Sequence, residues 1–150
     1  MGTHYSGSRK TIEALNSYIK LIRSAESLGS KIYLELNEFG LTESQFGVLD
    51  ALYHLGPMKQ KELGKKILKS GGNITMVINN LEKSCLVQRK KGEKDKRQFI
   101  INLTPAGKKT IQDLLPGITK MIKKHFAILT KEEQKELQRL CKIIGLQFRL

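Results

Sequence analysis

Residues 65–104 read KKILKSGGNITMVINNLEKSCLVQRKKGEKDKRQFIINLT, and this stretch decides the fold. After Ser70-Gly71-Gly72, which supply a helix cap and permissive backbone, the sequence predicts a helix over residues 72–84. Apolar residues recur there at intervals of three and four, as one core-facing stripe of Ile74, Val77, Ile78 and Leu81. The opposite face carries small and amide side chains, which suit the donor and acceptor edges of DNA bases. Any surface helix has a polar outer face, so the helix alone leaves both interpretations open.

The segment that follows predicts a β-hairpin with a basic tip. Residues 86–90 and 98–103 have the composition of two short strands. Between them lies KKGEKDKR, with Gly92 for the turn and five Lys or Arg in eight residues. Beside a polar-faced helix, such a tip can reach DNA phosphates or the minor groove. The sequence therefore predicts a winged helix-turn-helix, a mainly α-helical fold with a small β-hairpin wing.

The same stretch resembles the MarR family of transcriptional regulators. The motifs that carry the resemblance are Leu81-Glu82-Lys83 with Leu86-Val87, Asp95-Lys96-Arg97 in the wing, and Leu103-Thr104-Pro105-Ala106-Gly107 at the start of the next helix. They are specific in this order and spacing, and the likeness extends over most of the chain. It implies one domain, 1–150, in which helices within 10–40 and 104–150 form a dimerisation module around a winged helix-turn-helix over 41–103.

Periodicity and capping predict the remaining helices. We expect a long helix over 10–37, a second from the capping box Thr42–Gln45 to Leu55, and a short one over 59–67. Met58 stands where relatives often cap that short helix with Ser or Thr.

Two more helices follow the wing. Thr104-Pro105 opens one that runs towards Phe126, where Pro116 predicts a kink or a break near Leu115. The capping box at Thr130–Glu133 starts the last helix, whose apolar positions are Leu137, Leu140, Ile144 and Phe148. Terminal helices of this kind favour a homodimer, and a monomeric helical cap is the alternative.

The bulk properties concern partners rather than fold. Twenty-seven Lys and Arg against fourteen Asp and Glu give a net charge of +13 and a pI near 9.8, which favours double-stranded DNA as partner. A non-specific architectural DNA-binding protein, or a basic adaptor for acidic proteins or lipids, would fit the charge as well. No apolar run has the length of a membrane span and the first residues lack a secretory signal, so we expect a cytoplasmic protein without membrane contact.

No catalytic or cofactor motif is found. His4, His54 and His125 are isolated and lack zinc-ligand spacing, and no phosphate-binding glycine loop follows a strand. We therefore expect no enzyme activity, no cofactor and no metal. Cys85 stands where many MarR relatives have Gly at a left-handed helix end. It is interpreted either as a redox-sensing thiol or as a buried structural cysteine, and Cys141 is expected to pack in a core.

The candidate site residues fall into two groups. For base contacts we expect Asn73, Thr75, Met76 and Asn79, and for phosphates Lys69, Ser70 and Lys83. In the wing, Arg97 with Lys94 and Lys96 would contact the minor groove, and the resemblance implies that Asp95 orients Arg97. The resemblance also implies a small aromatic or phenolic effector between the winged region and the dimerisation helices. Candidates to line that pocket are Tyr33, Phe46, Tyr53 and His54. Together these features predict a sequence-specific, ligand-responsive repressor that binds a pseudo-palindromic operator as a homodimer.

Overall fold

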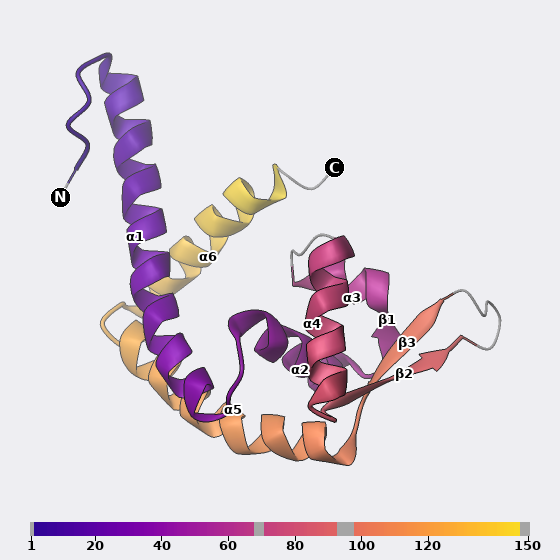
Figure 1. Cartoon of the computed structure of the whole chain (residues 1–150). Coiled ribbons are helices and arrows are strands. Elements are labelled where there is room, and N and C mark those ends of the chain that lie inside the picture. Colours follow the sequence, from indigo (N-terminus) through magenta and orange to yellow (C-terminus); the bar gives the residue numbers. More distant parts are fainter. Residues whose placement is uncertain (1, 68–70, 93–97, 148–150) are drawn as a thin grey trace. The chain divides into compact units, whose positions relative to one another are not determined.

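The computed structural model describes residues 2–67, 71–92 and 98–147 (Figure 1). Within these ranges the elements follow in the order α1 (Arg9–Glu38), α2 (Glu43–Leu55), β1 (Met58–Lys59), α3 (Gln60–Lys66), α4 (Gly71–Lys83), β2 (Val87–Lys91), β3 (Phe99–Leu103), α5 (Pro105–Phe126) and α6 (Lys131–Leu146). The predicted class, mainly α with a β-hairpin wing, is confirmed. The chain forms two compact units, residues 1–114 and 115–150, which divide within α5.

The core of the first unit is built from the apolar positions that the periodicity selected. The whole stripe of α4 is buried, and it is joined by residues from α1, α2, α3, β2, β3 and the first half of α5, among them Leu36, Leu49, Leu63, Val87, Ile101 and Ile111. No polar or charged side chain is buried among the described residues. Burial of these aliphatic side chains, each worth roughly 1.5–3 kcal/mol, fixes the position of α4 in the unit.

The sheet has three antiparallel strands in the order β1-β3-β2. The hairpin pairs Val87 with Leu103 and Arg89 with Ile101, while β1 pairs Met58 with Ile101 on the other edge of β3. The sequence reasoning missed β1, because two residues are too short for any periodicity. This strand ties the start of α3 to the base of the wing.

Caps define the helix ends where they were expected. Thr42 and Thr130 each form a complete capping box, with Gln45 and Glu133 respectively. At α3 the cap position is Lys59, whose ammonium group cannot accept a hydrogen bond. Only the returning half of a box forms there, in which the backbone N–H of Lys59 donates to Glu62 Oε2 (3.3 Å).

The C-terminal end of α4 is a Schellman motif closed by a non-glycine residue. The N–H of Leu86 donates to Leu81 O (2.9 Å), and that of Cys85 donates to Glu82 O (2.9 Å). Cys85 has a left-handed backbone, with φ +56°. Gly40 has the same conformation, with φ +65°, at the C-terminal end of α1. The expected strain at Cys85 is therefore present. The side chain is exposed, which corrects the interpretation as a buried cysteine: the left-handed cap residue lies outside the helix and directs its Cβ to solvent.

The start of α5 is fastened to this cap. The Thr104 hydroxyl donates to Cys85 O (2.6 Å), and the backbone N–H of Thr104 donates to Leu86 O (3.1 Å). Thr104 Oγ1 also accepts from the N–H of Gly107 (3.0 Å), so it caps the helix as predicted. A Cβ at Gly107 would overlap the carbonyl oxygen of Leu86, which explains the glycine of the Leu-Thr-Pro-Ala-Gly motif.

The helix α5 runs through Pro116, so of the predicted kink or break only the break is excluded. One expectation for the C-terminal helices is wrong. Cys141 is exposed rather than packed in a core, because the apolar side of α6 is not covered by the other described residues of its own unit. The five large apolar residues of α6 are 38–50% exposed: Leu137, Leu140, Ile143, Ile144 and Leu146.

Candidate nucleic-acid interface

The helix α4 presents the predicted polar face to solvent. Its buried stripe fixes the rotation of the helix, and the side opposite that stripe is exposed at Gly72, Asn73, Thr75, Met76, Asn79 and Lys83. Met76 lies on this face with 59% of its surface exposed. An exposed methionine beside amides can contact the methyl group of thymine. The face thus combines apolar and hydrogen-bonding groups on one rigid helix.

Thr75 is held within the helix-turn-helix pair rather than free on the face. Its hydroxyl donates to Gly71 O (2.9 Å) and accepts from Gln60 Nε2 of α3 (2.8 Å). Gln60 therefore joins the two helices across the turn. The hydroxyl proton of Thr75 is used within the protein, so the groups that it offers to a base are its methyl group and one remaining lone pair of Oγ1.

Asn79 belongs to a network that the sequence reasoning did not find. Arg89 of β2 donates through Nη2 to Asn79 Oδ1 (2.6 Å) and through Nη1 to Glu82 Oε2 (2.6 Å). The backbone N–H of Arg89 donates to the other carboxylate oxygen of Glu82 (3.1 Å). The Arg89 side chain is only 19% exposed and the pair is charge-assisted, so it locks α4 onto the wing.

The alternation of inward and outward side chains along β2 is a sequence signal from which the position of Arg89 could have been predicted. Val87 is buried, and residues two apart on a strand point to the same side, so Arg89 faces α4. A half-buried arginine needs an acidic partner, and Glu82 is the only acid in the residues of α4.

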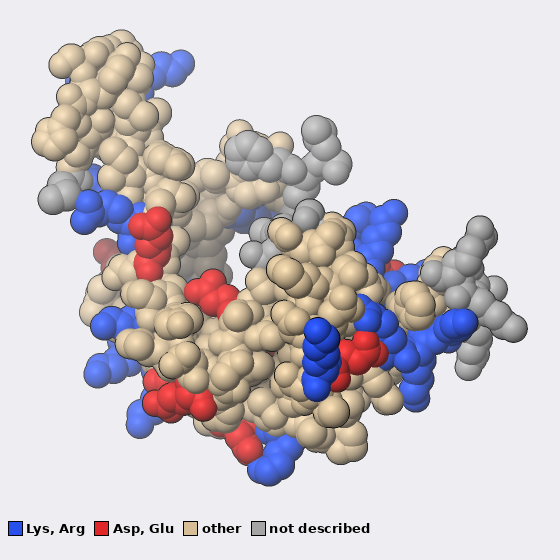
Figure 2. Space-filling view, in the orientation of Figure 1, with Lys and Arg blue, Asp and Glu red and all other residues tan. Residues whose placement is uncertain are grey.

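Basic side chains surround this face. Figure 2 shows Lys and Arg gathered around the wing strands on the side in view, while the surface over α4 is mostly uncharged. Lys83 at the end of α4 and Lys90 and Lys91 of β2 are exposed. The predicted residues Lys69, Ser70, Lys94, Asp95, Lys96 and Arg97 lie outside the described residues. Among the described residues, Lys83, Lys90 and Lys91 place cationic groups beside the polar face, and such groups bind DNA phosphates.

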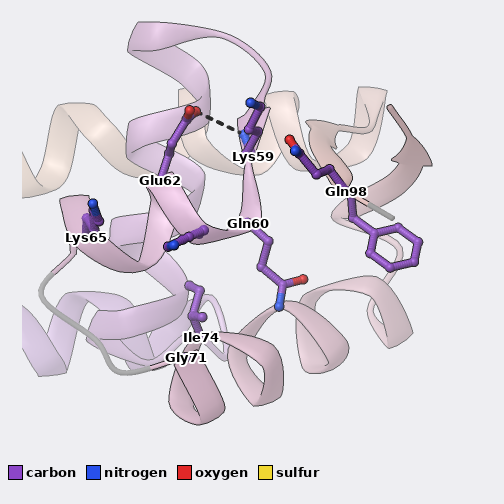
Figure 3. Close-up of a pocket in the computed structure, with 9 residues that line it drawn as sticks. Lys59, Gln60, Glu62, Lys65, Gly71, Ile74 and Gln98 are labelled. Atoms are coloured by element: carbon purple, nitrogen blue, oxygen red, sulfur yellow. Dashed lines mark hydrogen bonds between the residues drawn. The ribbon is translucent and has the colours of Figure 1, made fainter. Parts of the chain in front are cut away.

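A hollow of about 590 Å³ lies where α3, α4 and β3 meet (Figure 3). Its rim is basic, with Lys59, Lys61 and Lys65 against one acid, Glu62, and its apolar lining includes Ile74 and Phe99. Figure 3 shows the Gln60 side chain extending towards α4, in line with its bond to Thr75. The first turn of α4 borders the hollow at Gly71, and a helix N-terminus favours negative charge. Sequence reasoning missed the three lysines because they lie on the supporting helix α3 and at its cap position.

The four predicted effector-pocket residues are not gathered in one cavity. Tyr33 lines a shallow hollow of about 390 Å³ with Ala25, Glu26, Gly29 and Ser30 of α1 and with Glu43. Tyr53 and His54 form an edge-to-face ring contact with centroids 5.1 Å apart, and Tyr53 Oη accepts from Gln112 Nε2 at 3.5 Å. Phe46 is half-buried in α2. Neither of the two hollows described above includes Phe46, Tyr53 or His54.

Other site classes find no support in the described residues. No three His, Cys, Asp or Glu within them are placed to hold a metal ion. None of the helices, over the ranges described, is long and apolar enough to cross a bilayer.

Comparison with known proteins identifies the relatives of this arrangement. Residues 41–99 match the MarR family model. The regulator MhqR of Bacillus subtilis, an HTH-type transcriptional regulator, is 30% identical over 136 residues, which cover 91% of this chain and 94% of MhqR. AbsC, a MarR family transcriptional regulator from Streptomyces coelicolor, has the same fold, with a TM-score of 0.86, 23% identity and 98% and 99% of the two chains covered.

A DNA complex is also among the similar structures. MepR of Staphylococcus aureus bound to DNA superposes with a TM-score of 0.76 at 26% identity, over 86% of this chain and 96% of MepR. The matched region 41–99 contains the exposed face of α4 and the first strand of the wing, β2. The chain belongs to the MarR family of winged helix-turn-helix transcriptional regulators, which bind DNA and are not enzymes.

Proposed function

We propose that the protein is a sequence-specific repressor that binds its operator as a homodimer. In this proposal α4 enters the major groove, with Asn73, Thr75, Met76 and Asn79 towards the bases. The observation that carries it is the exposed, acid-poor face of α4, held in a fixed rotation by its buried stripe and bordered by lysines. A charge-driven binder would not need apolar and amide groups on the same face.

The wing would contact the minor groove through Arg97, oriented by Asp95, with Lys94 and Lys96 on the phosphates. Lys69, Ser70 and Lys83 would hold the backbone at the two ends of α4. The basic rim at Lys59, Lys61 and Lys65 supports a phosphate path along the hollow beside α3. These contacts position the protein, whereas α4 reads the sequence.

Dimerisation would use the helices within 10–40 and 104–150. The exposed apolar side of α6 supports this, because an uncovered aliphatic surface favours a partner. Two-fold symmetry then requires a pseudo-palindromic operator with half-sites about 34–36 Å apart.

The repressor would respond to a small aromatic or phenolic effector. The hollow that Tyr33 lines and the aromatic pair Tyr53–His54 lie on α1 and α2, beside the winged region in the same unit. An effector there would favour one separation of the two α4 helices over another. A ligand shifts this equilibrium only by its difference in affinity for the two states.

The test is fluorescence anisotropy with the DNA upstream of the protein's own gene, against a scrambled duplex, at about 0.15 M salt. We expect the native fragment to bind roughly a thousandfold more tightly, and transcription from it in vitro to fall when protein is added. Equal, steeply salt-dependent binding to both duplexes would instead favour an architectural protein. No binding to either would favour a basic adaptor.

A pair of substitutions distinguishes residues that recognise bases from residues that bind the DNA backbone or minor groove. Asn79→Ala should relax base preference with a modest loss of operator affinity, because it removes hydrogen bonds to a base edge worth on the order of 1–3 kcal/mol. Arg97→Ala should weaken binding to every duplex by a similar factor, since the wing contacts backbone and minor groove. Both are measured by anisotropy on the operator and on point-substituted duplexes. An Asn79→Ala protein with unchanged preference would remove Asn79 from the reading face.

A further inference from the structure

We propose that Arg89 is a specificity-determining residue: it turns the Asn79 amide so that α4 selects guanine over adenine at the base pair beneath it. The inference rests on the proposed placement of α4 in the major groove. It concerns one contact of that interface and the residue behind it.

The orientation of the amide follows from the chemistry of its neighbour. A guanidinium group has only donors, and Arg89 Nη2 lies 2.6 Å from the Asn79 side chain. The atom that faces Arg89 must therefore be the oxygen, Oδ1. The NH2 group is the other end of the planar amide, and Asn79 is exposed on the outer face of α4.

Arg89 is itself held firmly. Glu82 accepts from both its guanidinium (2.6 Å) and its backbone N–H (3.1 Å), and β2 fixes the backbone opposite Ile101 of β3. Because the side chain is mostly buried, leaving this position for a DNA phosphate would strand the Glu82 carboxylate. The guanidinium thus remains behind Asn79 while the outer face is occupied.

The consequence is a change in which base asparagine prefers. Asparagine usually pairs with adenine by accepting from N6 and donating to N7. Here the accepting atom already binds a cation, which opposes the approach of a second positively polarised N–H. The two protons of the NH2 group meet matching acceptors on guanine, which presents N7 and O6. Donor-only presentation therefore favours guanine.

The experiment begins with selection of duplexes from a random library by the wild-type protein. The same selection with Asn79→Ala identifies the operator position that residue 79 reads. It is the one position, or column of the aligned selected sequences, at which the base preference of the wild type is lost. Anisotropy then compares two duplexes that differ only by guanine or adenine there. We expect the wild type to prefer guanine by about tenfold, and Arg89→Met to reduce this ratio to about twofold or less, because the released amide can rotate.

Two further variants control for folding and for charge. Asn79→Asp keeps a partner for Arg89 and presents only acceptors, so it should shift the preference towards cytosine, whose N4 donates. Lys90→Met removes a neighbouring exposed cation of β2 without touching Asn79. It should weaken both duplexes equally and leave the ratio unchanged, and circular dichroism establishes that each variant is folded.

The outcomes separate this inference from the proposed function. An adenine column at the Asn79 position, or a guanine preference that survives Arg89→Met, overturns the role of Arg89 while specific binding stands. Should Arg89→Met fail to fold, Asn79→Asp decides the matter, and an unchanged guanine column overturns the inference. A selection without any preferred column refutes sequence-specific binding, and this inference with it.

Discussion

The helices α4 and α6 carry the same kind of apolar stripe in opposite surroundings. In α4 the four residues of the stripe are at most 8% exposed, whereas in α6 no residue is buried within the described chain. The uncovered face of α4 is polar apart from Met76, whereas in α6 the apolar stripe itself is uncovered. Helical periodicity thus predicts that a surface will be covered, but the covering residues can belong to the same chain or to another one.

The largest effect on the free energy of unfolding should come from a substitution in the buried stripe of α4. Ile78→Ala removes a fully buried side chain, and large-to-small substitutions in a core cost about 2–5 kcal/mol. The matched change Ile144→Ala on α6 should cost the isolated chain little. Urea unfolding over a wide range of protein concentration distinguishes them: the loss for Ile78→Ala should not depend on concentration. A loss for Ile144→Ala should act through dimer formation and vary with concentration.

The second effect concerns the uncovered side of α6. Leu140→Glu places a charge in the exposed apolar face and should convert the dimer to monomer, as measured by sedimentation equilibrium. Operator affinity should then fall by at least about a hundredfold, because two linked half-sites no longer bind together. Lys135→Glu, a charge change elsewhere on the same helix, is the control and should stay dimeric. If Leu140→Glu also stays dimeric, the interface lies elsewhere.

A third, smaller effect tests Cys85, the residue with a positive φ that follows the end of α4. Cys85→Gly should raise the free energy of unfolding by about 1 kcal/mol, because glycine adopts a positive φ without steric cost. This should shift the midpoint of thermal unfolding upward by roughly 2–4 °C. Gly40→Ala, at the equivalent cap of α1, should lower it. An unchanged or lowered midpoint for Cys85→Gly would mean that the thiol makes a compensating contact.

The sequence predicted the elements because their signals are local. Capping boxes at Thr42 and Thr130, the α4 stripe and the basic hairpin each lie within a few residues, and the bounds of the helices before α6 agree with the structure to within one or two positions. The predicted last helix extends to Phe148, which lies outside the described residues. The resemblance added the glycine position at Cys85, whose left-handed backbone the structure confirms.

The features that sequence reasoning missed depend on contacts between elements. Strand β1 exists because β3 offers it an edge, and the Arg89–Glu82–Asn79 network joins a strand to a helix seven to ten residues away. Exposure of Cys141 follows from the absence of a covering element within the described chain, which an apolar pattern cannot reveal. Base-contact candidates were chosen by their face on the wheel, so the hydrogen bonds of Thr75 and Asn79 within the protein were not anticipated.

The contacts of Thr104 couple the end of α4 rigidly to the start of α5. Two hydrogen bonds and the close approach of Gly107 to Leu86 hold the two helix ends together. A loop without such contacts would absorb a small rotation of α5. Because of these contacts, a displacement of the first turn of α5 is expected to move the carboxyl end of α4 and the start of β2 with it.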